Sequence, residues 1–242
     1  MTLDDVLTAL FPSGHQIERG PSGTLHGSAT VEGQSKVTVV GIVDGTPLGI
    51  DAAILLAGHV LAAVEAGDGA PIIVLVDTAS QNMARRDELL GLNEYLAHLT
   101  KSLTLAAARG HHTMSVLFGG AAAGAFIAAA LSSRFLIALP GANPSVMDLP
   151  SISRVTKLPL EQLEKLAKVT PIFAPGAEPL FAIGALSQIW TDDKSFAPRL
   201  AELLRQPVAA SDQRDQIGLE RKGRLLAKQI AERVAAEAAT HA

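Results

Sequence analysis

The sequence predicts an α/β fold in which helices cover a partly parallel β-sheet. Three observations indicate it. Pro71–Val76 is an unbroken apolar run of strand length, as expected for a strand buried on both faces. In the segment that follows, leucines recur every three or four residues, which is the period of a helix. Strand, helix and strand then alternate again from Thr113 to Leu139, and such alternation produces parallel strands with right-handed crossovers.

The N-terminal part is expected to contain a lead-in, a hairpin and a helix. Residues 1–22 are expected to be an irregular lead-in with a short helix. Leu25–Val31 and Lys36–Val43 alternate and are rich in valine and threonine, which predicts two strands. Because Glu32-Gly33-Gln34 lies between them, they are expected to form a hairpin. A helix should then run from Asp51 to Glu65 and end at the glycines beyond it.

After the buried strand, the pattern of strand and helix continues. A polar loop, Asp77–Met83, leads into one long helix that is expected to end near Arg109. The leucines of this helix form one apolar stripe that we expect to face the core: Leu89, Leu92, Leu96, Leu99 and Leu103. Thr113–Phe118 is the next predicted strand. A glycine-rich turn then opens a helix to Ser132, and Phe135–Leu139 is a further strand.

The C-terminal part is expected to be helical. Pro159–Lys168 and Glu178–Leu186 are predicted helices, and residues 212–242 are predicted to be a helical extension with its helix at Gln216–Ala239. No internal repeat or low-complexity linker interrupts the chain. We therefore expect a single domain over residues 1–242.

The composition excludes several classes of protein. Apolar residues make up 48 % and charged residues 18 %, which argues against disorder. The formal net charge is −4 and no long basic run is present, so a nucleic-acid partner has no electrostatic support. The absence of cysteine excludes a disulfide scaffold and a thiolate zinc site, and no other metal cluster is evident. Acidic residues stand where a signal peptide needs basic ones, so we expect a cytoplasmic protein.

One uncharged stretch, Thr113–Ser133, is long enough to be considered as a membrane span. Its many alanines and glycines contribute little to membrane insertion. The stretch also divides into a strand-like part and a turn that opens a helix. We therefore expect no membrane segment.

The first segment that could carry chemistry directly follows the buried strand. It is Asp77-Thr78-Ala79-Ser80-Gln81. Ligands bind at the carboxyl ends of parallel strands, so Thr78, Ala79, Ser80 and Gln81 are candidate substrate-binding residues. The alternative interpretation is a polar strand exit in which Asp77 forms a turn.

The second candidate segment, Gly119–Phe126, joins a strand to a helix. Small residues let a ligand approach the backbone, and the first N–H groups of a helix attract negative charge. Gly124 and Ala125 are therefore the candidate catalytic residues, which would stabilise an oxyanion. The candidate substrate-binding residues of this segment are Gly119, Gly120 and Ala121. Close packing of a small-residue helix on its neighbour is the alternative.

Several charged or titratable side chains have two interpretations. Arg85, Arg86, Asp87 and Glu88 form a charge cluster at a helix start, or Arg85 and Arg86 form a docking site for a partner, such as an acidic carrier protein or its phosphate arm. His111 and His112 follow a helix end, where solvation or interaction with the helix dipole is favoured over a role as a base. His98 lies near the apolar stripe and is interpreted as a buried histidine with its hydrogen bonds satisfied.

Five runs of sequence, together with Gln81, carry a resemblance to a known family. They are Leu75–Thr78 with Gln81, Arg85–Asn93 with Tyr95–Leu99, Arg154–Pro159, and Phe173–Gly176. These runs resemble the gamma subunit of biotin-independent malonate decarboxylase, a carboxyltransferase-like protein of the crotonase (ClpP/crotonase) fold. The resemblance covers roughly Val37 to Trp190, which is most of the chain.

The resemblance implies a fold, a reaction and partners. The fold would consist of repeated strand-strand-helix units around a partly parallel sheet. The reaction would convert a malonyl thioester to an acetyl thioester and CO2, at an oxyanion-stabilising site shared with a beta subunit. The substrate would be carried on a coenzyme-A-like prosthetic arm of an acyl-carrier subunit, and no cofactor would be bound directly.

The chain departs from the family pattern at both candidate segments. Ala123-Gly124-Ala125 stands where the family shows Ser-Gly-Gly, and Ser80 stands where glycine is frequent. A backbone N–H survives such an exchange, but a Cβ now projects from each changed position. Two other functions are therefore considered. One is a non-catalytic scaffold that completes the partner's active site. The other is a Clp-type serine hydrolase, whose nucleophile would fall at Ala122, which has no hydroxyl.

Overall fold

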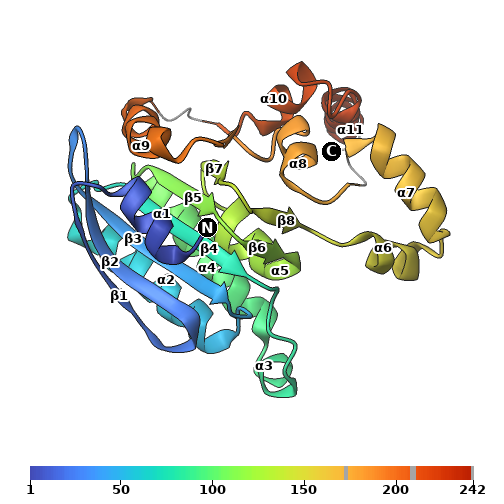
Figure 1. Cartoon of the computed structure of the whole chain (residues 1–242). Helices are drawn as coiled ribbons and strands as arrows, with labels where there is room; N and C mark the ends of the chain where they lie inside the picture. The colour runs from blue at the N-terminus through green and yellow to red at the C-terminus, as the bar shows by residue number, and fades with distance from the viewer. Residues whose placement is uncertain (172–173, 208–210, 241–242) are drawn as a thin grey trace. The chain divides into compact units, whose positions relative to one another are not determined.

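The computed structural model describes residues 1–171, 174–207 and 211–240, and it confirms an α/β fold with a mostly parallel sheet (Figure 1). The chain divides into two compact units. Unit 1 comprises Met1–Val146 and Gln188–Val208, and unit 2 comprises Met147–Ser187 and Ala209–Ala242. The expectation of one domain over residues 1–242 stays a prediction.

The sheet of unit 1 has the order β1-β2-β3-β4-β5-β7-β9 among the described residues. Its first three strands pair antiparallel and the remaining ones pair parallel. The strands are β1 (His15–Arg19), β2 (Thr24–Val31), β3 (Gln34–Gly45), β4 (Ile72–Thr78), β5 (Thr113–Leu117), β7 (Phe135–Ala138) and β9 (Gln188–Ile189). A small parallel pair is formed by β6 (Gly120–Ala122) and β8 (Asn143–Ser145).

Helices cover both faces of this sheet. On one face, α1 (Leu3–Leu10) and α9 (Phe196–Arg205) pack over alternate strand residues and enclose several of the largest core side chains, among them Trp190. On the other face, α2 (Ile50–Ala66) and α4 (Leu92–Ala108) lie side by side (Figure 1). Because β4 and β5 are buried from both sides, Ile72–Val76 of β4 is a continuous apolar run, and even the hydroxyl residues of β5, Thr113 and Ser115, are buried.

Shorter elements complete unit 1. They are α3 (Arg85–Leu89), α5 (Ala123–Phe126), a π-helical turn (Ile127–Leu131) that continues α5, and 3-10 turns at Pro21–Gly23 and Asp193–Ser195. In unit 2, the described residues form α6 (Leu149–Thr156), α7 (Leu160–Val169), α8 (Ala177–Ala182), α10 (Arg214–Glu220) and α11 (Ala227–Thr240). The guanidinium of Arg221, which follows α10, donates hydrogen bonds to the carbonyls of Phe181, Leu186 and Ser187.

Most predicted elements of the sheet region are confirmed, and two expectations are wrong. The hairpin, the helix after it and the buried strands lie where the patterns placed them. Residues 15–19, expected to be irregular, instead form β1, which pairs with β2 from His15 opposite Ala29 to Arg19 opposite Leu25. This edge strand has a mostly exposed, polar sequence, so it lacks the apolar alternation that identifies strands.

The single long helix predicted before Arg109 is wrong, because two helices, α3 and α4, occupy this segment. Gly91 separates them with a left-handed φ of 83°, which glycine adopts without steric cost. As a result, Leu89 is 75 % exposed and does not belong to the apolar stripe. The predicted helix at Gln216–Ala239 is likewise divided into α10 and α11. Among the residues described, no helix has both the length and the apolarity that a membrane span requires.

Candidate functional site

The two candidate segments meet at the carboxyl end of the parallel strands, where Asp77 joins them. Oδ1 of Asp77 accepts a hydrogen bond from the Gly120 N–H at 3.0 Å, and Oδ2 accepts one from the Gly45 N–H at 3.2 Å. The carboxylate therefore connects the ends of β3 and β4 to the start of β6. A Cβ at Gly119 would lie 2.1 Å from Oδ1, so a side chain cannot be accommodated there. Asp77 thus has the turn-forming role of the alternative interpretation.

The hydroxyls of the first segment bond within the chain. Thr78 is fully buried, and its Oγ1 donates to the carbonyl of Thr46 at 2.6 Å. The Ser80 hydroxyl donates to the carbonyl of Gln81 at 3.0 Å. Ala79, between them, is exposed. Neither hydroxyl is therefore positioned as a free donor to a ligand.

The backbone on either side of Gln81 is held by a short parallel bridge to Leu48. The Leu48 N–H donates to the carbonyl of Ser80 at 2.8 Å, and the Asn82 N–H donates to the carbonyl of Leu48 at 2.9 Å. A segment paired in this way behaves like a strand, so the direction of the Gln81 side chain is fixed by its backbone.

That side chain reaches the second segment. The Gly124 N–H donates a hydrogen bond to Oε1 of Gln81 at 2.9 Å. A Cβ at Gly124 would lie 3.3 Å from the same oxygen and 3.2 Å from Cδ1 of Leu96 on α4. Ala125, the next residue, is fully buried. The turn is therefore packed between the β4–α3 loop and α4, and its N–H at Gly124 already has a partner.

The turn from β6 into α5 contains a strained residue. Ala122 is extended, whereas Ala123 has a left-handed φ of 51°. This conformation costs an L-residue roughly 1–2 kcal/mol, and it persists only where the surrounding structure enforces it. Strain of this kind occurs preferentially at functional sites. Ala121, just before it, is buried and pairs with Pro144 of β8.

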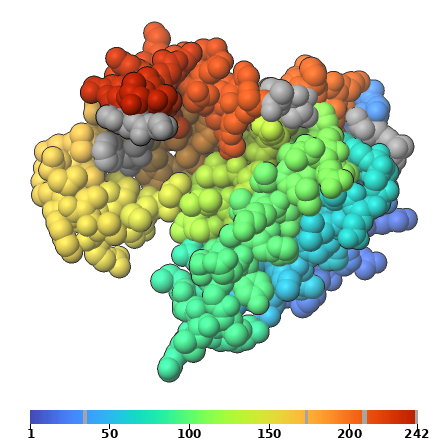
Figure 2. All heavy atoms as spheres, turned by 180° about the vertical axis from the view of Figure 1, so that it is seen from behind, coloured from blue at the N-terminus to red at the C-terminus, as the bar shows by residue number. Residues whose placement is uncertain are grey.

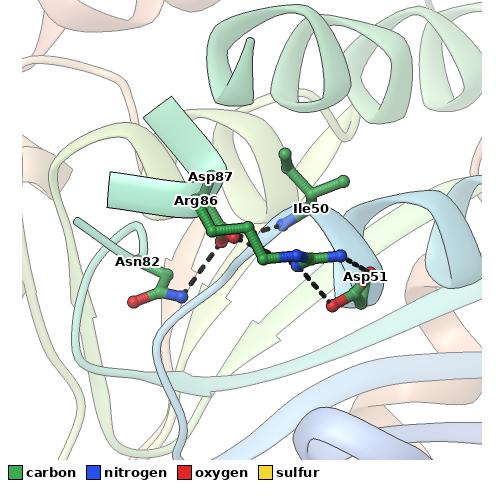
Figure 3. Close-up of polar contacts among 5 residues, drawn as sticks. All are labelled: Ile50, Asp51, Asn82, Arg86 and Asp87. Carbon is green, nitrogen blue, oxygen red and sulfur yellow. Dashed lines mark hydrogen bonds and ion pairs between the residues drawn. The ribbon is translucent and has the colours of Figure 1, made fainter. Parts of the chain in front are cut away.

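A polar cluster beside this region explains the charged run at the start of α3 (Figure 3). Asp87 is only 3 % exposed, and its Oδ2 accepts hydrogen bonds from the Ile50 N–H at 3.3 Å and from the Asn82 amide at 3.0 Å. Arg86 pairs with both oxygens of Asp51 at 2.8 and 3.1 Å, and with Asp87 at 3.3 Å. Because Asp87 satisfies an N–H in the first turn of α2, it acts as a cap for that helix.

Of the two candidate docking residues, only Arg86 takes part in this cluster. Arg85 is exposed and has no ion-pair partner in the part of the chain that the structure describes. It lies on a projection formed by α3 and the residues that flank it, which stands out from the rest of unit 1 (Figure 2). The projection also carries exposed apolar side chains: Met83 at 76 %, Leu89 at 75 % and Leu90 at 53 %.

The histidines are arranged differently from the sequence interpretation. His98 is exposed, so the expectation that it is buried is wrong. His111 is buried and its Nδ1 lies 2.7 Å from the carbonyl of Ala70, so it is not solvated. His112 is half-buried and stacks on Phe135, and burial lowers its pKa. None of these side chains contacts the candidate site through a described hydrogen bond. Within residues 1–171, 174–207 and 211–240, no cluster of three or more titratable ligands is arranged to hold a metal ion.

Sequence reasoning did not find the contacts that fill the site. The Asp77–Gly120 and Gln81–Gly124 hydrogen bonds each join residues 43 positions apart. The sequence shows polar residues after β4 and small residues at the turn into α5, but it does not show which of them pair. What remains for chemistry is a backbone turn, a fixed carboxamide and small residues, an arrangement suited to binding an oxygen that carries negative charge.

Three comparisons place the chain among known proteins. Residues 43–238 match the family described as malonate decarboxylase gamma subunit. The malonyl-S-ACP:biotin-protein carboxyltransferase MADD of Malonomonas rubra is 27 % identical over 169 residues, which cover 64 % of this chain and 58 % of that protein. The chain thus spans little more than half the length of this curated relative.

Solved structures show the same fold. A Pseudomonas malonate decarboxylase hetero-tetramer in complex with coenzyme A contains a chain with a TM-score of 0.79 and 24 % identity, covering 96 % of this chain and 98 % of that one. The Pseudomonas MdcD-MdcE hetero-dimer gives a TM-score of 0.71 and 25 % identity, with coverage of 93 % and 98 %. The crotonase-type, carboxyltransferase-like fold is therefore confirmed. Because the family match extends over most of the sequence, this chain belongs to the malonate decarboxylase gamma subunit family.

Proposed function

We propose that this chain pairs with a beta subunit to form a site that decarboxylates a malonyl thioester. Family membership supports the reaction class, and the related hetero-dimer and hetero-tetramer of Pseudomonas support the pairing. The relative from Malonomonas rubra carries malonyl-S-ACP in its name, which supports a substrate bound to an acyl-carrier subunit. A thioester arm resembling coenzyme A would then present the malonyl group, and the chain itself would hold no cofactor.

The chemistry needs a group that stabilises negative charge. When the bond between the α-carbon and the carboxylate breaks, CO2 leaves and its bonding electrons form an enolate. Charge therefore builds on the thioester oxygen, and a proton from an acid or from water then attaches to the α-carbon. Fixed hydrogen-bond donors aimed at that oxygen lower the barrier, typically by about 3 kcal/mol per donor.

The observation that carries the proposal is the junction of the two strand-end segments. Gly124 and Ala125 lie at the start of a helix, and the Thr78–Gln81 loop is connected to them by the Gln81–Gly124 hydrogen bond. Gly119, Gly120 and Ala121 bring the backbone of β6 to the same junction. In this proposal the turn is catalytic, and the two flanking segments position the substrate.

A second function, a non-catalytic scaffold, has a specific observation in its favour. The N–H groups of both Gly120 and Gly124 already donate to side chains of this chain. If both bonds persist in the assembled enzyme, these two donors are not available to a substrate. The gamma chain would then complete the partner's active site without contributing its own donors.

Variants can distinguish a docking role of Arg85 and Arg86 from a role in stability. Arg86 is engaged by Asp51, whereas Arg85 is exposed on the projection. If the projection receives an acidic carrier or its phosphate, Arg85→Ala should raise the KM for the malonyl carrier several-fold without lowering stability. Arg86→Ala should lower the melting temperature as well. Equal KM values for wild type and Arg85→Ala would remove the docking role.

We also propose that residues 1–242 form a single domain and that the protein is cytoplasmic.

The experiment that tests the function measures CO2 release from a malonyl carrier by the assembled beta–gamma pair. Gly124→Val places a branched side chain against Leu96 and Gln81, and turnover should fall about 100-fold or more. Gly124→Ala adds only one methyl group at the same place and should lose less. Melting and pairing with beta are measured on each variant. A folded, paired Gly124→Val complex with normal turnover would favour the scaffold over the catalytic turn.

A further inference from the structure

The carboxamide of Gln81 has one bonded end and one end that is available. Its Oε1 accepts the Gly124 N–H at 2.9 Å. A carboxamide has one acceptor oxygen and one NH2 group, and only the oxygen can accept a hydrogen bond from an N–H. The orientation of the group is therefore fixed, and Nε2 faces away from Gly124. Nε2 forms no hydrogen bond with any residue that the structure describes.

Three constraints hold this carboxamide in place. The backbone on both sides of Gln81 is bridged to Leu48. The oxygen is bonded to Gly124, and the absence of a side chain there leaves room for it, since a Cβ would lie 3.3 Å from the oxygen. The residue is half-buried, so its side chain is partly shielded from solvent. A donor held in this way needs no reorganisation when charge develops beside it.

We propose that Gln81 is a catalytic residue whose Nε2–H donates to the thioester oxygen of the malonyl substrate, while Gly124 anchors its Oε1. This inference rests on the proposed function and refines it. It gives a function to the hydrogen bond that occupies the Gly124 N–H. This backbone N–H would not bind the substrate itself, but would hold the Gln81 carboxamide so that Nε2 can donate to the substrate. As the enolate forms, the negative oxygen shortens and strengthens the bond from Nε2.

Two variants of similar length separate this role from its alternatives. Gln81→Glu keeps an acceptor for Gly124 and removes the NH2 group. Gln81→Met keeps the length of the side chain and removes both functions. If Nε2 stabilises the transition state, both variants should lose about 100-fold in kcat, and KM should change by less than about threefold. Gln206→Glu, an exposed position at the end of α9, makes the same charge change as a control and should keep wild-type activity.

Other patterns would overturn the proposal. An active Gln81→Glu with an impaired Gln81→Met means that the side chain only anchors the turn. A lower KM with unchanged kcat in Gln81→Met means that Oε1 occupies the place of the substrate oxygen and is displaced by it. A rise in KM alone for Gln81→Glu indicates repulsion of the malonyl carboxylate.

The design also separates failure of this inference from failure of the proposed function. The wild-type beta–gamma pair is first assayed for CO2 release from the malonyl carrier. An inactive wild-type pair counts against the function itself. An active wild-type pair with fully active Gln81 variants removes only the role of Gln81. Protection of the Gly124 amide from hydrogen exchange, measured in the Gln81→Glu pair, reports whether the anchoring bond is retained.

Discussion

The side chain of Asp77 determines which residue can follow β5 at position 119. A Cβ on Gly119 would lie 2.1 Å from Oδ1 of Asp77 and 3.0 Å from its Cβ. The carboxylate cannot move away without releasing the N–H groups of Gly45 and Gly120. The glycine here is therefore required by packing and hydrogen bonding, and not by a special backbone conformation.

Gly119→Ala should accordingly lower the free energy of unfolding by about 1–3 kcal/mol, the usual cost of overpacking. Gly58→Ala is the matched control, since a Cβ at this exposed position within α2 would meet no atom within 4 Å. That exchange should raise stability by about 0.5–1 kcal/mol, because alanine favours the helix. Urea denaturation of both variants checks the prediction. If Gly119→Ala is as stable as Gly58→Ala, the Asp77 contact is not a constraint.

At this scale the sequence predicted residue types but not their contacts. Small residues at the β6–α5 turn and polar residues after β4 are visible in the sequence. Their pairing is not, because the Gln81–Gly124 bond depends on a side-chain conformation and on the register of two distant segments. The buried Asp87 was also missed, since it stands in a run of charged residues that is typical of a solvated helix start.

Among the elements, the break between α3 and α4 best shows what periodicity can and cannot predict. Leu92, Leu99 and Leu103 are buried as the stripe requires, and Leu96 is half-buried. Leu89 fits the same spacing but lies beyond the break at Gly91, where the chain changes direction. Hydrophobic spacing assumes one straight axis, so it predicts the face of a helix and not the point at which the helix begins.

The loss of stability caused by aspartate at three of these leucines should increase with the burial of the replaced side chain. Leu103→Asp places an unpaired carboxylate in the core and should cost about 3 kcal/mol or more. Leu96→Asp, at a half-buried position, should cost less, and Leu89→Asp should change stability by less than about 0.5 kcal/mol. Melting temperatures of the three variants provide the test. Equal losses for Leu89→Asp and Leu103→Asp would show that α3 and α4 act as one buried helix.

The packing of α2 on the antiparallel strands introduces a dependence on pH. His59 of α2 stacks on His26 of β2 with ring centroids 4.1 Å apart. Burial, and secondly the neighbouring His26, lower the pKa of His59. Glu18, Lys36 and Asp68 line the groove next to this pair. Between the lowered pKa and the unfolded value of about 6.5, the unfolded chain binds more protons than the folded chain does.

The stability that neutral His59 supports is thus fully present above about pH 6.5 and is lost as the pH falls through and below that value. The wild type should therefore lose stability between pH 7.5 and pH 5.5. His59→Gln should lose less over the same interval. Some loss should remain, because burial lowers the pKa of His112 as well. Denaturation curves at the two pH values measure the difference. Identical losses in the two proteins would show that the stacked pair is not the origin of the pH dependence of stability.

At the scale of the whole molecule, the question is what this chain assembles with. The fold class was predictable from the sequence because strand and helix alternate strongly in unit 1. The regular elements among the described residues of unit 2 are helices, and α11 contains no buried residue. Its exposed Ile230 and Val234 follow the spacing of a helix face. The sequence therefore predicted the helix, but it does not show what this apolar face contacts.

Pairing with a beta subunit is the prediction that concerns the whole chain. When the two are expressed together with an affinity tag on beta alone, the chain should co-purify and elute with beta as one species at micromolar concentration. The expectation follows from its family and from the related MdcD-MdcE hetero-dimer. Light scattering on the eluted peak gives the mass and hence the stoichiometry. Arg85→Ala should co-purify as well as wild type if this residue serves the carrier rather than beta. A chain that elutes separately from beta in both forms, while its melting curve shows that it is folded, would contradict the pairing and the shared active site that depends on it.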